Sequence, residues 1–303
     1  MPQVQANGIT LHYESHGPES GEPILLIMGL GAQMTRWPAE FYGRLTDQGY
    51  RVILFDNRDV GLSEKLDAAG APDLPAIAAA LREGKAPRVA YCLDDMADDT
   101  AGLLDALGIE RAHIVGASMG GMIAQLVAAN HPGKTLSLTS IMSTTGNPGL
   151  PRAKPEAIAV LNNRGPDPRE DMEGFLANAV ASNKVTGSPA YPAEEAAIRE
   201  RAKADFERSY HPVGFSRQYA AVTASPDRRP RLAKITTPTV VVHGQDDPLV
   251  PVEGGHDTAA NIPGAELFVL PGMGHDLPPA LHGQIVAAIL RVAQRAKASA
   301  EAG

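Results

Sequence analysis

Apolar runs recur along the chain and alternate with segments of helical periodicity. Six runs predict strands buried in a sheet, at residues 23–28, 51–55, 113–115, 136–142, 239–243 and 267–270. Apolar residues at helical spacing predict helices over 37–48 and 93–107, from 119 onward, and from 281 to about 296. Strands that alternate with helices form a mostly parallel sheet flanked by those helices, so the pattern predicts an α/β protein.

Two segments depart from this alternation. Residues 9–15 alternate apolar and polar side chains, and Asn7-Gly8 before them is a strong hairpin turn, so we expect an antiparallel hairpin at the sheet edge. Residues 65–91 form a long connection rich in Ala, Pro and Gly, with one short helix at 74–82. Connections of this length are uncommon without a function, and we expect this one at the rim of a pocket.

The apolar runs are interrupted between residues 144 and 231. This interval contains many prolines and charged residues, shows no buried strand, and has helix-like segments at 155–161, 172–182, 193–210 and 215–223. It predicts a helical cap, residues 144–231, that lies over the mouth of the sheet and is inserted between the two parts of a core formed by residues 1–143 and 232–303.

Composition narrows the classes of partner. The 303 residues are 44% hydrophobic and 20% charged, as in ordinary globular proteins, and the formal net charge of −8 argues against nucleic acid or an anionic membrane as a partner. A single cysteine, Cys92, excludes an internal disulfide and suits a reducing compartment. No signal-peptide pattern or long apolar span is evident, so we expect a cytoplasmic protein with a small-molecule partner.

Charged residues near two predicted elements have structural interpretations. The helix at 93–107 carries Asp94, Asp95, Asp98 and Asp99 in its first turns, where carboxylates favour the positive end of the helix dipole. We interpret them as a solvated acidic face and not as a metal site, and we predict neither a metal nor a cofactor. Arg58 and Asp59, in the polar turn after residues 51–55, are expected to cap and cross-link the backbone.

The main candidate for chemistry is Ser118, in the stretch 111–125, RAHIVGASMGGMIAQ. Here the buried strand turns abruptly into a helix, and a serine on such a turn requires small neighbours, which Gly116 and Gly120 provide. The turn would lift the hydroxyl above the sheet and the helix would aim its free N–H groups at the same point. A Gly-x-Ser-x-Gly sequence also arises by chance as an ordinary turn, so the flanking strand and helix favour a nucleophile.

A serine hydroxyl needs a base to accept its proton and a carboxylate to orient that base. Two later predicted strands end in suitable turns: Asp246 and Asp247 follow residues 239–243, and His275 follows residues 267–270. Both turns are expected at the carboxyl edge of the sheet, where Ser118 also lies. The order serine, aspartate, histidine fits a catalytic triad.

The chain resembles the α/β-hydrolase superfamily over nearly its whole length. Five motifs occur in the family order: MGLG at 28–31, DNRDVGLS at 56–63, GASMGG at 116–121, HGQDDPLVP at 243–251 and GMGH at 272–275. The resemblance implies an α/β-hydrolase fold, with a mostly parallel sheet, flanking helices and a helical cap insertion.

The resemblance also implies roles for individual residues. In the family, the acid is the residue three after the turn glycine, which maps onto Asp247 in preference to Asp246. Two backbone N–H groups form an oxyanion hole, and they map onto Leu30 and Met119. The chain has Met28 where a histidine often precedes the glycine, but the backbone donor does not depend on that side chain. His113, His131 and His243 lack the setting of His275, and we interpret them as structural.

A serine at position 118 implies acyl transfer, because related dehalogenases and epoxide hydrolases attack with an aspartate. The elbow and the segment GMGHDLPP at 272–279 look most similar to bacterial esterases, including methylesterases of aromatic polyketides. We therefore predict a carboxylic ester hydrolase for small or medium apolar esters. A hydrolase of C–C, lactone or amide bonds and a non-enzymatic ligand receptor remain alternatives, and the sequence does not decide the oligomeric state.

Overall fold

A computed structural model describes residues 2–163 and 165–301. Its centre is an eight-stranded sheet in the order β1-β2-β4-β3-β5-β6-β7-β8. The strands are β1 (Gln3–Ala6), β2 (Ile9–His16), β3 (Pro23–Ile27), β4 (Arg51–Phe55), β5 (Ala112–Ala117), β6 (Thr135–Ile141), β7 (Thr239–Gly244) and β8 (Glu266–Leu270). All six predicted strands are present, but β8, the last strand of the sheet, is only partly buried.

Six neighbouring strands of the sheet, β4, β3, β5, β6, β7 and β8, are parallel, and β1 and β2 are antiparallel to their neighbours. The predicted hairpin is confirmed, because Asn7 and Gly8 both adopt positive φ between β1 and β2. Parallel strands end at a common edge, so the segments that follow β3, β4, β5, β7 and β8 lie together there. The sheet thus gathers five loops that are far apart in the sequence.

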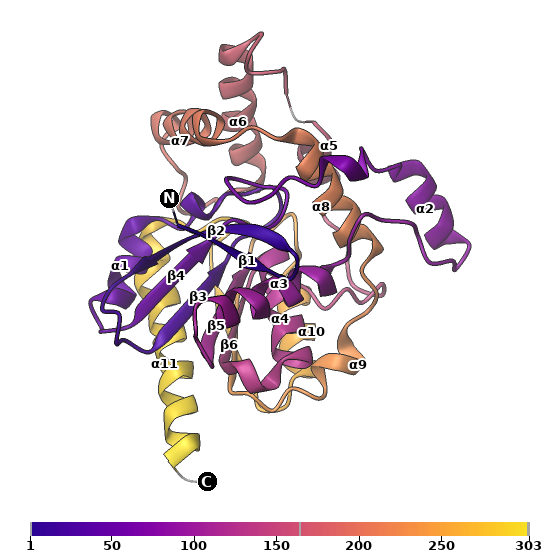
Figure 1. Ribbon diagram of the computed structural model, residues 1–303. Coiled ribbons are helices and arrows are strands. Elements are labelled where there is room, and N and C mark those ends of the chain that lie inside the picture. The colour runs from indigo at the N-terminus through magenta and orange to yellow at the C-terminus, as the bar shows by residue number, and fades with distance from the viewer. Residues whose placement is uncertain (1, 164, 302–303) are drawn as a thin grey trace.

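Helices cover both faces of the sheet. The helices are α1 (Ala39–Thr46), α2 (Leu74–Arg82), α3 (Leu93–Ala106), α4 (Met119–Asn130), α5 (Pro155–Asn162), α6 (Met172–Thr186), α7 (Glu195–Arg208), α8 (Pro212–Ala224), α9 (Arg229–Leu232), α10 (Glu253–Asn261) and α11 (His282–Glu301). Apolar side chains of α1 and α11 pack on one face, and those of α3 and α4 pack on the other (Figure 1). The predicted α/β fold with a mostly parallel sheet is confirmed.

Helix α10 is an element that the sequence pattern does not predict. Its second and third residues are Gly254 and Gly255, which are poor helix formers. A Cβ on Gly255 would lie 2.6 Å from the Nδ1 atom of His243, so the glycine is required by the close approach of α10 to β7. Helix α11 also extends beyond the predicted end near residue 296, to Glu301.

The described residues between β6 and β7 contain helices and no strand. In Figure 1, α6 and α7 lie above the end of the sheet, with α5 and α8 next to them. The four predicted helical segments correspond to α5, α6, α7 and α8. The division of the chain into a core and a cap at residues 144 and 231 stays a prediction.

The acidic face predicted for α3 is wrong for one of its four aspartates. Asp99 is buried, and its carboxylate accepts hydrogen bonds from Nε and Nη2 of Arg58 at 2.6 and 2.5 Å. Burial raises the pKa of the Asp99 carboxyl, although the hydrogen bonds from Arg58 oppose this shift. The predicted cross-linking role of Arg58 is confirmed, and α3 is thereby tied to the loop after β4.

The long connection at residues 65–91 packs against α8 and the residue before it. Arg217 of α8 donates a hydrogen bond to the carbonyl oxygen of Gly70 at 3.0 Å, and His211 lies 3.1 Å from the Asp67 carboxylate. No residue of the connection lines the cavity described below, although its Asp67 contacts His211, which does. The connection therefore lies next to this cavity without forming its wall, and its expected position at a pocket rim stays a prediction.

Candidate active site

Ser118 lies at the turn between β5 and α4, with φ 57° and ψ −121°. A non-glycine residue rarely adopts a positive φ, so the surrounding structure must hold this conformation. A Cβ on Gly116 would lie 2.0 Å from the carbonyl oxygen of Gly120, and a Cβ on Gly120 would lie 2.1 Å from that of Ile27. The two glycines of the motif are thus required by close backbone contacts.

His275 and Asp247 meet Ser118 at the edge of the sheet. The Nε2 atom of His275 is 2.9 Å from the Ser118 hydroxyl oxygen, and its Nδ1 atom is 2.7 Å from the Oδ2 atom of Asp247. Burial lowers the pKa of the His275 imidazole, but the charge and the hydrogen bond of Asp247 outweigh this effect and leave the pKa above its ordinary value. Asp247 therefore favours proton uptake by His275.

The structure also distinguishes the two adjacent aspartates. The Asp247 side chain is fully buried, and its Oδ1 atom accepts hydrogen bonds from the N–H groups of Leu249 and Val250 at 2.9 and 2.8 Å. Asp246 is exposed and accepts a hydrogen bond from the Gly272 N–H at 2.9 Å. Of the two aspartates, Asp247 is the one in contact with His275, and its role as the acid stays a prediction.

Two backbone segments approach the Ser118 hydroxyl. A Cβ on Gly29 would lie 3.1 Å from the Cβ of Ser118, so the turn after β3 is in direct contact with it. The N–H of Leu30, the next residue, makes no hydrogen bond with another described residue. Met119 is the first residue of α4, whose backbone bonds to Ser118 begin with Gly121 and Met122. Both predicted oxyanion donors are therefore available beside Ser118.

Comparison with known proteins identifies the family. A family model described as the alpha/beta hydrolase fold matches residues 22–278. This chain belongs to the α/β-hydrolase family. The match covers the strands that carry Leu30, Ser118, Asp247 and His275, so the geometry above lies inside the family's own fold.

Relatives of this hydrolase have several named activities. It is 29% identical over 309 residues to rhodomycin D methylesterase DauP from Streptomyces sp. (strain C5), and the alignment covers 94% of this chain and 95% of the relative. It is 30% identical over 275 residues to a 2-hydroxy-6-oxononadienedioate/2-hydroxy-6-oxononatrienedioate hydrolase from Burkholderia vietnamiensis, with 88% and 85% covered. Its fold is similar to that of the enol-lactonase from Burkholderia xenovorans, with TM-score 0.70 and 24% identity over 97% of this chain and 98% of that one.

The described residues include neither a membrane-spanning helix nor a metal-binding group. None of the helices that the structure describes has the length and apolar character needed to cross a bilayer. Within the same residues, no group of three or more His, Cys, Asp or Glu side chains is arranged to hold a metal ion.

A second histidine supports the Asp247 turn of the hydrolase. His243 is buried at the end of β7, and its Nε2 atom donates a hydrogen bond to the carbonyl oxygen of Val250 at 2.8 Å. The same nitrogen lies 3.8 Å from the Oδ2 atom of Asp247, and burial lowers the pKa of the imidazole. The structural interpretation of His243 holds, and its contact with Val250 closes the loop that surrounds the aspartate.

The end of α6 holds the His275 loop of the hydrolase. The His275 N–H donates to the carbonyl oxygen of Thr186 at 2.7 Å, and the Gly274 N–H donates to the Ser188 hydroxyl at 2.9 Å. The Ser188 hydroxyl in turn donates to the Asp276 carboxylate. Sequence reasoning did not find Thr186 or Ser188, because their contacts bridge segments about ninety residues apart and no local motif marks them.

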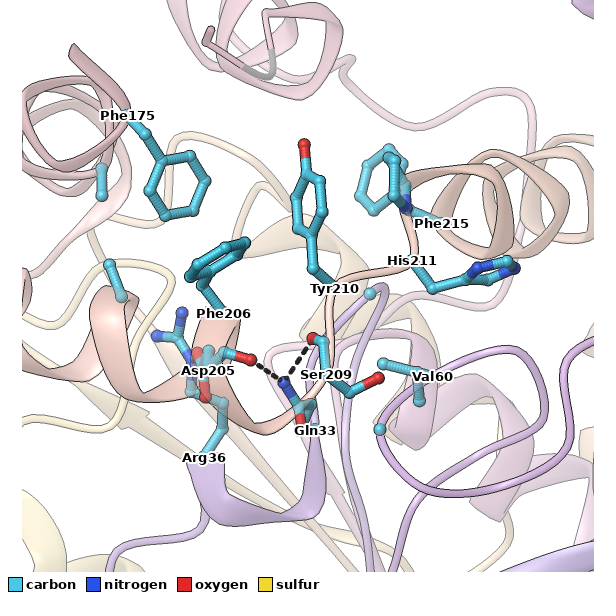
Figure 2. A pocket seen from close by; sticks show the side chains of 15 residues that line it. Gln33, Arg36, Val60, Phe175, Asp205, Phe206, Ser209, Tyr210, His211 and Phe215 are labelled. Carbon is cyan, nitrogen blue, oxygen red and sulfur yellow. Dashed lines mark hydrogen bonds and ion pairs between the residues drawn. The ribbon is translucent and has the colours of Figure 1, made fainter. Parts of the chain in front are cut away.

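A cavity of about 160 Å³ lies between the loops of the sheet edge and the helices above it. Figure 2 shows Phe175 of α6, Phe206 of α7, Tyr210 and Phe215 around it, with Gln33, Arg36 and Asp205 on one side. The cavity reaches Gly31, next to Leu30, but Ser118 and His275 are not on its wall. One side of the cavity is therefore aromatic and the other is polar.

Proposed function

We propose that this hydrolase is a carboxylic ester hydrolase that acts through a triad of Ser118, His275 and Asp247. The hydrogen-bonded chain from the Ser118 hydroxyl through His275 to the buried Asp247 carboxylate carries the proposal. Its two distances and its order of groups are those required for a serine nucleophile activated by a histidine base. The 29% identity to a methylesterase along almost the full length of both chains supports ester hydrolysis.

In the acylation step, the Ser118 hydroxyl oxygen attacks the ester carbonyl carbon while its proton passes to Nε2 of His275. The carbonyl π electrons move to the oxygen, and the N–H groups of Leu30 and Met119 stabilise that oxyanion. When the tetrahedral intermediate collapses, the bond to the alkoxy group breaks and His275 returns its proton to the leaving alcohol. The product is an acyl ester of Ser118.

The deacylation step repeats this chemistry with water. His275 accepts a proton from a water molecule, whose oxygen attacks the acyl carbon, and the oxyanion forms at the same two donors. Collapse breaks the bond to the Ser118 oxygen, which recovers a proton from His275, and the carboxylic acid leaves. Asp247 stabilises the imidazolium in both steps. All of these groups belong to the chain, so the proposed mechanism needs no metal or cofactor.

The aromatic side of the cavity supports small to medium apolar esters as substrates. Phe175, Phe206 and Tyr210 lie in mutual contact, with ring centroids 5.5 to 6.4 Å apart. Such rings gain free energy by covering an apolar or aromatic group of a ligand. We propose that this cluster holds the part of the ester remote from the reacting carbonyl, because the cavity wall begins at Gly31 beside the proposed oxyanion hole.

The test is hydrolysis of p-nitrophenyl acetate, butyrate and benzoate by the wild type and by Ser118→Ala. We expect the wild type to release p-nitrophenol, and the variant to lose at least about 10⁴-fold in kcat. A burst of p-nitrophenol equal to the enzyme concentration would report the acyl-serine intermediate. Wild-type inactivity on all three esters, or full activity of the variant, would refute the proposal.

A second candidate is hydrolysis of another bond by the same triad. The relative from Burkholderia vietnamiensis is named for a substrate with a ketone and two carboxylates and without an ester, at 30% identity. The matching test is a panel that adds a lactone, an anilide and a vinylogous 1,5-diketone acid to the esters. The highest kcat/KM on one of these three substrates would assign the hydrolase to that bond.

A further inference from the structure

Helix α8 presents one face to the loops of the sheet edge. Gly214, Arg217 and Gln218 lie on that face, because residues three and four apart along a helix are neighbours. A Cβ on Gly214 would lie 2.1 Å from the carbonyl oxygen of Asp59, so the helix backbone nearly touches the loop after β4. Arg217 binds the Asp59 carboxylate through Nε and Nη2 at 2.8 and 2.6 Å.

Gln218 connects this helix to two loops at once. Its Oε1 atom accepts a hydrogen bond from the Gly31 N–H at 2.7 Å, and its Nε2 atom donates one to the carbonyl oxygen of Arg58 at 2.8 Å. The residue is 0% exposed. Water therefore does not compete for either bond, and the amide is held in one orientation by a donor on one side and an acceptor on the other.

The Gly31 N–H belongs to the turn that carries Leu30. The Ala32 N–H donates to the carbonyl oxygen of Gly29 at 3.2 Å, which closes a four-residue turn with Leu30 and Gly31 in the middle. Gly31 has φ 65°, a conformation that favours glycine at the third position of such a turn. The central peptide plane, which joins Leu30 to Gly31, has its orientation fixed by the Gln218 acceptor.

The two peptide planes on either side of Leu30 are thus fixed by different partners. The plane that contains the Leu30 N–H is held from within the turn, through the Gly29 carbonyl. The plane that follows Leu30 is held from outside, by Gln218 on α8. Without the Gln218 acceptor only the turn's own bond from Ala32 to Gly29 remains, so the central peptide rotates more easily and the Leu30 N–H loses part of the rigid support that an oxyanion donor requires.

We propose that Gln218 is a positioning residue for the oxyanion hole: through the Gly31 N–H it fixes the turn that presents the Leu30 N–H to the reacting oxygen. This inference rests on the proposed function, because the Leu30 N–H has this task only if Ser118 forms an oxyanion. It makes a helix outside the sheet part of the catalytic geometry, so that the oxyanion hole is complete only when α8 is docked.

A simpler role for Gln218 is to anchor α8 by its two buried hydrogen bonds. The two roles predict different kinetics. An anchor contributes to stability and to the shape of the cavity, and its loss changes the melting temperature and KM. A positioning residue contributes to the transition state, so its loss lowers kcat and weakens ligands that form an oxyanion, while ligands without one bind as before.

The test compares Gln218→Met with Gln125→Met. Gln125 is a matched control, because it is also 0% exposed and also makes two side-chain hydrogen bonds, to Ser140 and Arg228 at 3.2 Å each. Gln218→Asn is a second variant, which keeps a buried amide but shortens it by one methylene. Each protein is assayed with p-nitrophenyl butyrate and with an alkyl trifluoromethyl ketone. The Ser118 oxygen adds to the carbonyl carbon of this ketone while its proton passes to His275, which leaves a negative oxygen in the hole. The corresponding methyl ketone reports binding in the ground state.

We expect Gln218→Met to lower kcat by about 10- to 100-fold, less than the loss of about 10²- to 10³-fold for removal of a donor. Affinity for the trifluoromethyl ketone should fall by a similar factor, while the methyl ketone and KM change little, and Gln125→Met should match the wild type in all of these values. Gln218→Asn should show the same pattern if Gln218→Met does not fold.

Unchanged kcat and trifluoromethyl ketone affinity in a folded Gln218 variant, or a rise in KM alone, would overturn the inference. A wild type without ester hydrolysis or trifluoromethyl ketone inhibition would instead refute the proposed function, and the inference with it.

Discussion

The sheet edge that holds Ser118 and the helical segment above it are kept in place by different interactions. At the sheet edge, backbone geometry positions the groups: Ser118 has φ 57°, and Gly116 and Gly120 have no room for a side chain. In the helical segment, buried side chains reach across to the sheet edge, with Arg217 on Asp59 and Gln218 on the Gly31 N–H.

This difference separates local from long-range causes. The close contact of Gly116 with Gly120 lies within the Ser118 motif, so a short sequence marks it, although Gly120 also meets the Ile27 carbonyl of β3. The contact between Gln218 and Gly31 joins positions 187 residues apart, and it exists only because α8 packs on the loops. We therefore expect substitutions at the sheet edge to act on chemistry and most substitutions above it to act on stability and substrate binding, with Gln218 as the proposed exception.

Asp247→Asn tests the sheet edge and has the largest expected effect. An amide in place of the buried carboxylate favours the wrong tautomer of His275 and no longer stabilises the imidazolium, so we expect kcat to fall by about 10⁴-fold. The measurement is steady-state hydrolysis of p-nitrophenyl butyrate.

The neighbouring Asp246→Asn is the control for that experiment. Asp246 is exposed and contacts Gly272 instead of His275, so this variant should hydrolyse the ester at the wild-type rate. Equal losses in both variants would show that the turn after β7 acts only through its overall charge or fold.

Arg217→Met tests the anchoring of α8. The Arg217 and Asp59 side chains are 1% and 0% exposed, and hydrogen bonds from Arg217 and Leu66 hold the pKa of Asp59 below its ordinary value although burial alone would raise it. The substitution leaves a buried carboxylate without its cation, which costs about 3–5 kcal/mol in the free energy of unfolding. Urea denaturation of the wild type and the variant measures this loss.

Arg199→Met is the matched substitution at an exposed ion pair of the same segment. Arg199 of α7 pairs with Glu173 and Glu195, whose side chains are 75% and 60% exposed. A pair of this kind contributes at most about 1 kcal/mol, because water screens it. Similar losses in the two variants would contradict a special role for the buried pair.

The sequence predicts the strands and turns of the sheet edge for a physical reason. Buried strands such as 51–55 have few polar residues, and turns such as Asn7-Gly8 require specific backbone angles, so both leave a local pattern. The placement of Ser118, Asp247 and His275 in turns after successive strands follows from the same patterns. The catalytic roles of these three residues are part of the proposed function.

What the sequence does not predict lies mostly in contacts between distant segments. Asp99 occupies a charged helix face, yet Arg58, 41 positions away, draws it into the interior. Gly254 and Gly255 obscure α10, because the close approach of His243 requires a glycine where helix propensity disfavours one. Ser188 and Gln218 carry no motif, and their partners are known only once the helices are placed above the sheet.

The pH dependence of activity tests the coupling between Asp247 and His275. The base must be neutral to accept a proton, so kcat/KM should fall by about tenfold per pH unit on the acid side of the His275 pKa. Because Asp247 raises that pKa, the midpoint should lie above the ordinary value of 6.5. In Asp247→Asn the raising effect is lost and burial still lowers the pKa, so the midpoint of the residual activity should move to lower pH. A rate that is flat down to pH 5 in the wild type would exclude a histidine base.

Phe206→Leu has the smallest expected effect and tests the aromatic side of the cavity. Phe206 packs on Tyr210 and Phe175 with ring centroids 5.5 and 6.4 Å apart, and all three line the cavity. Leucine keeps most of the apolar volume but removes the ring, so KM for p-nitrophenyl benzoate should rise about two- to tenfold while KM for the acetate and kcat for both stay nearly constant. Phe268→Leu, a partly buried ring on β8 outside the cavity, is the control and should change neither KM. A loss in kcat at Phe206 would place this part of the segment in the chemistry and would erase the contrast between the two regions, whereas a change confined to the benzoate KM would show that the aromatic cluster recognises the substrate.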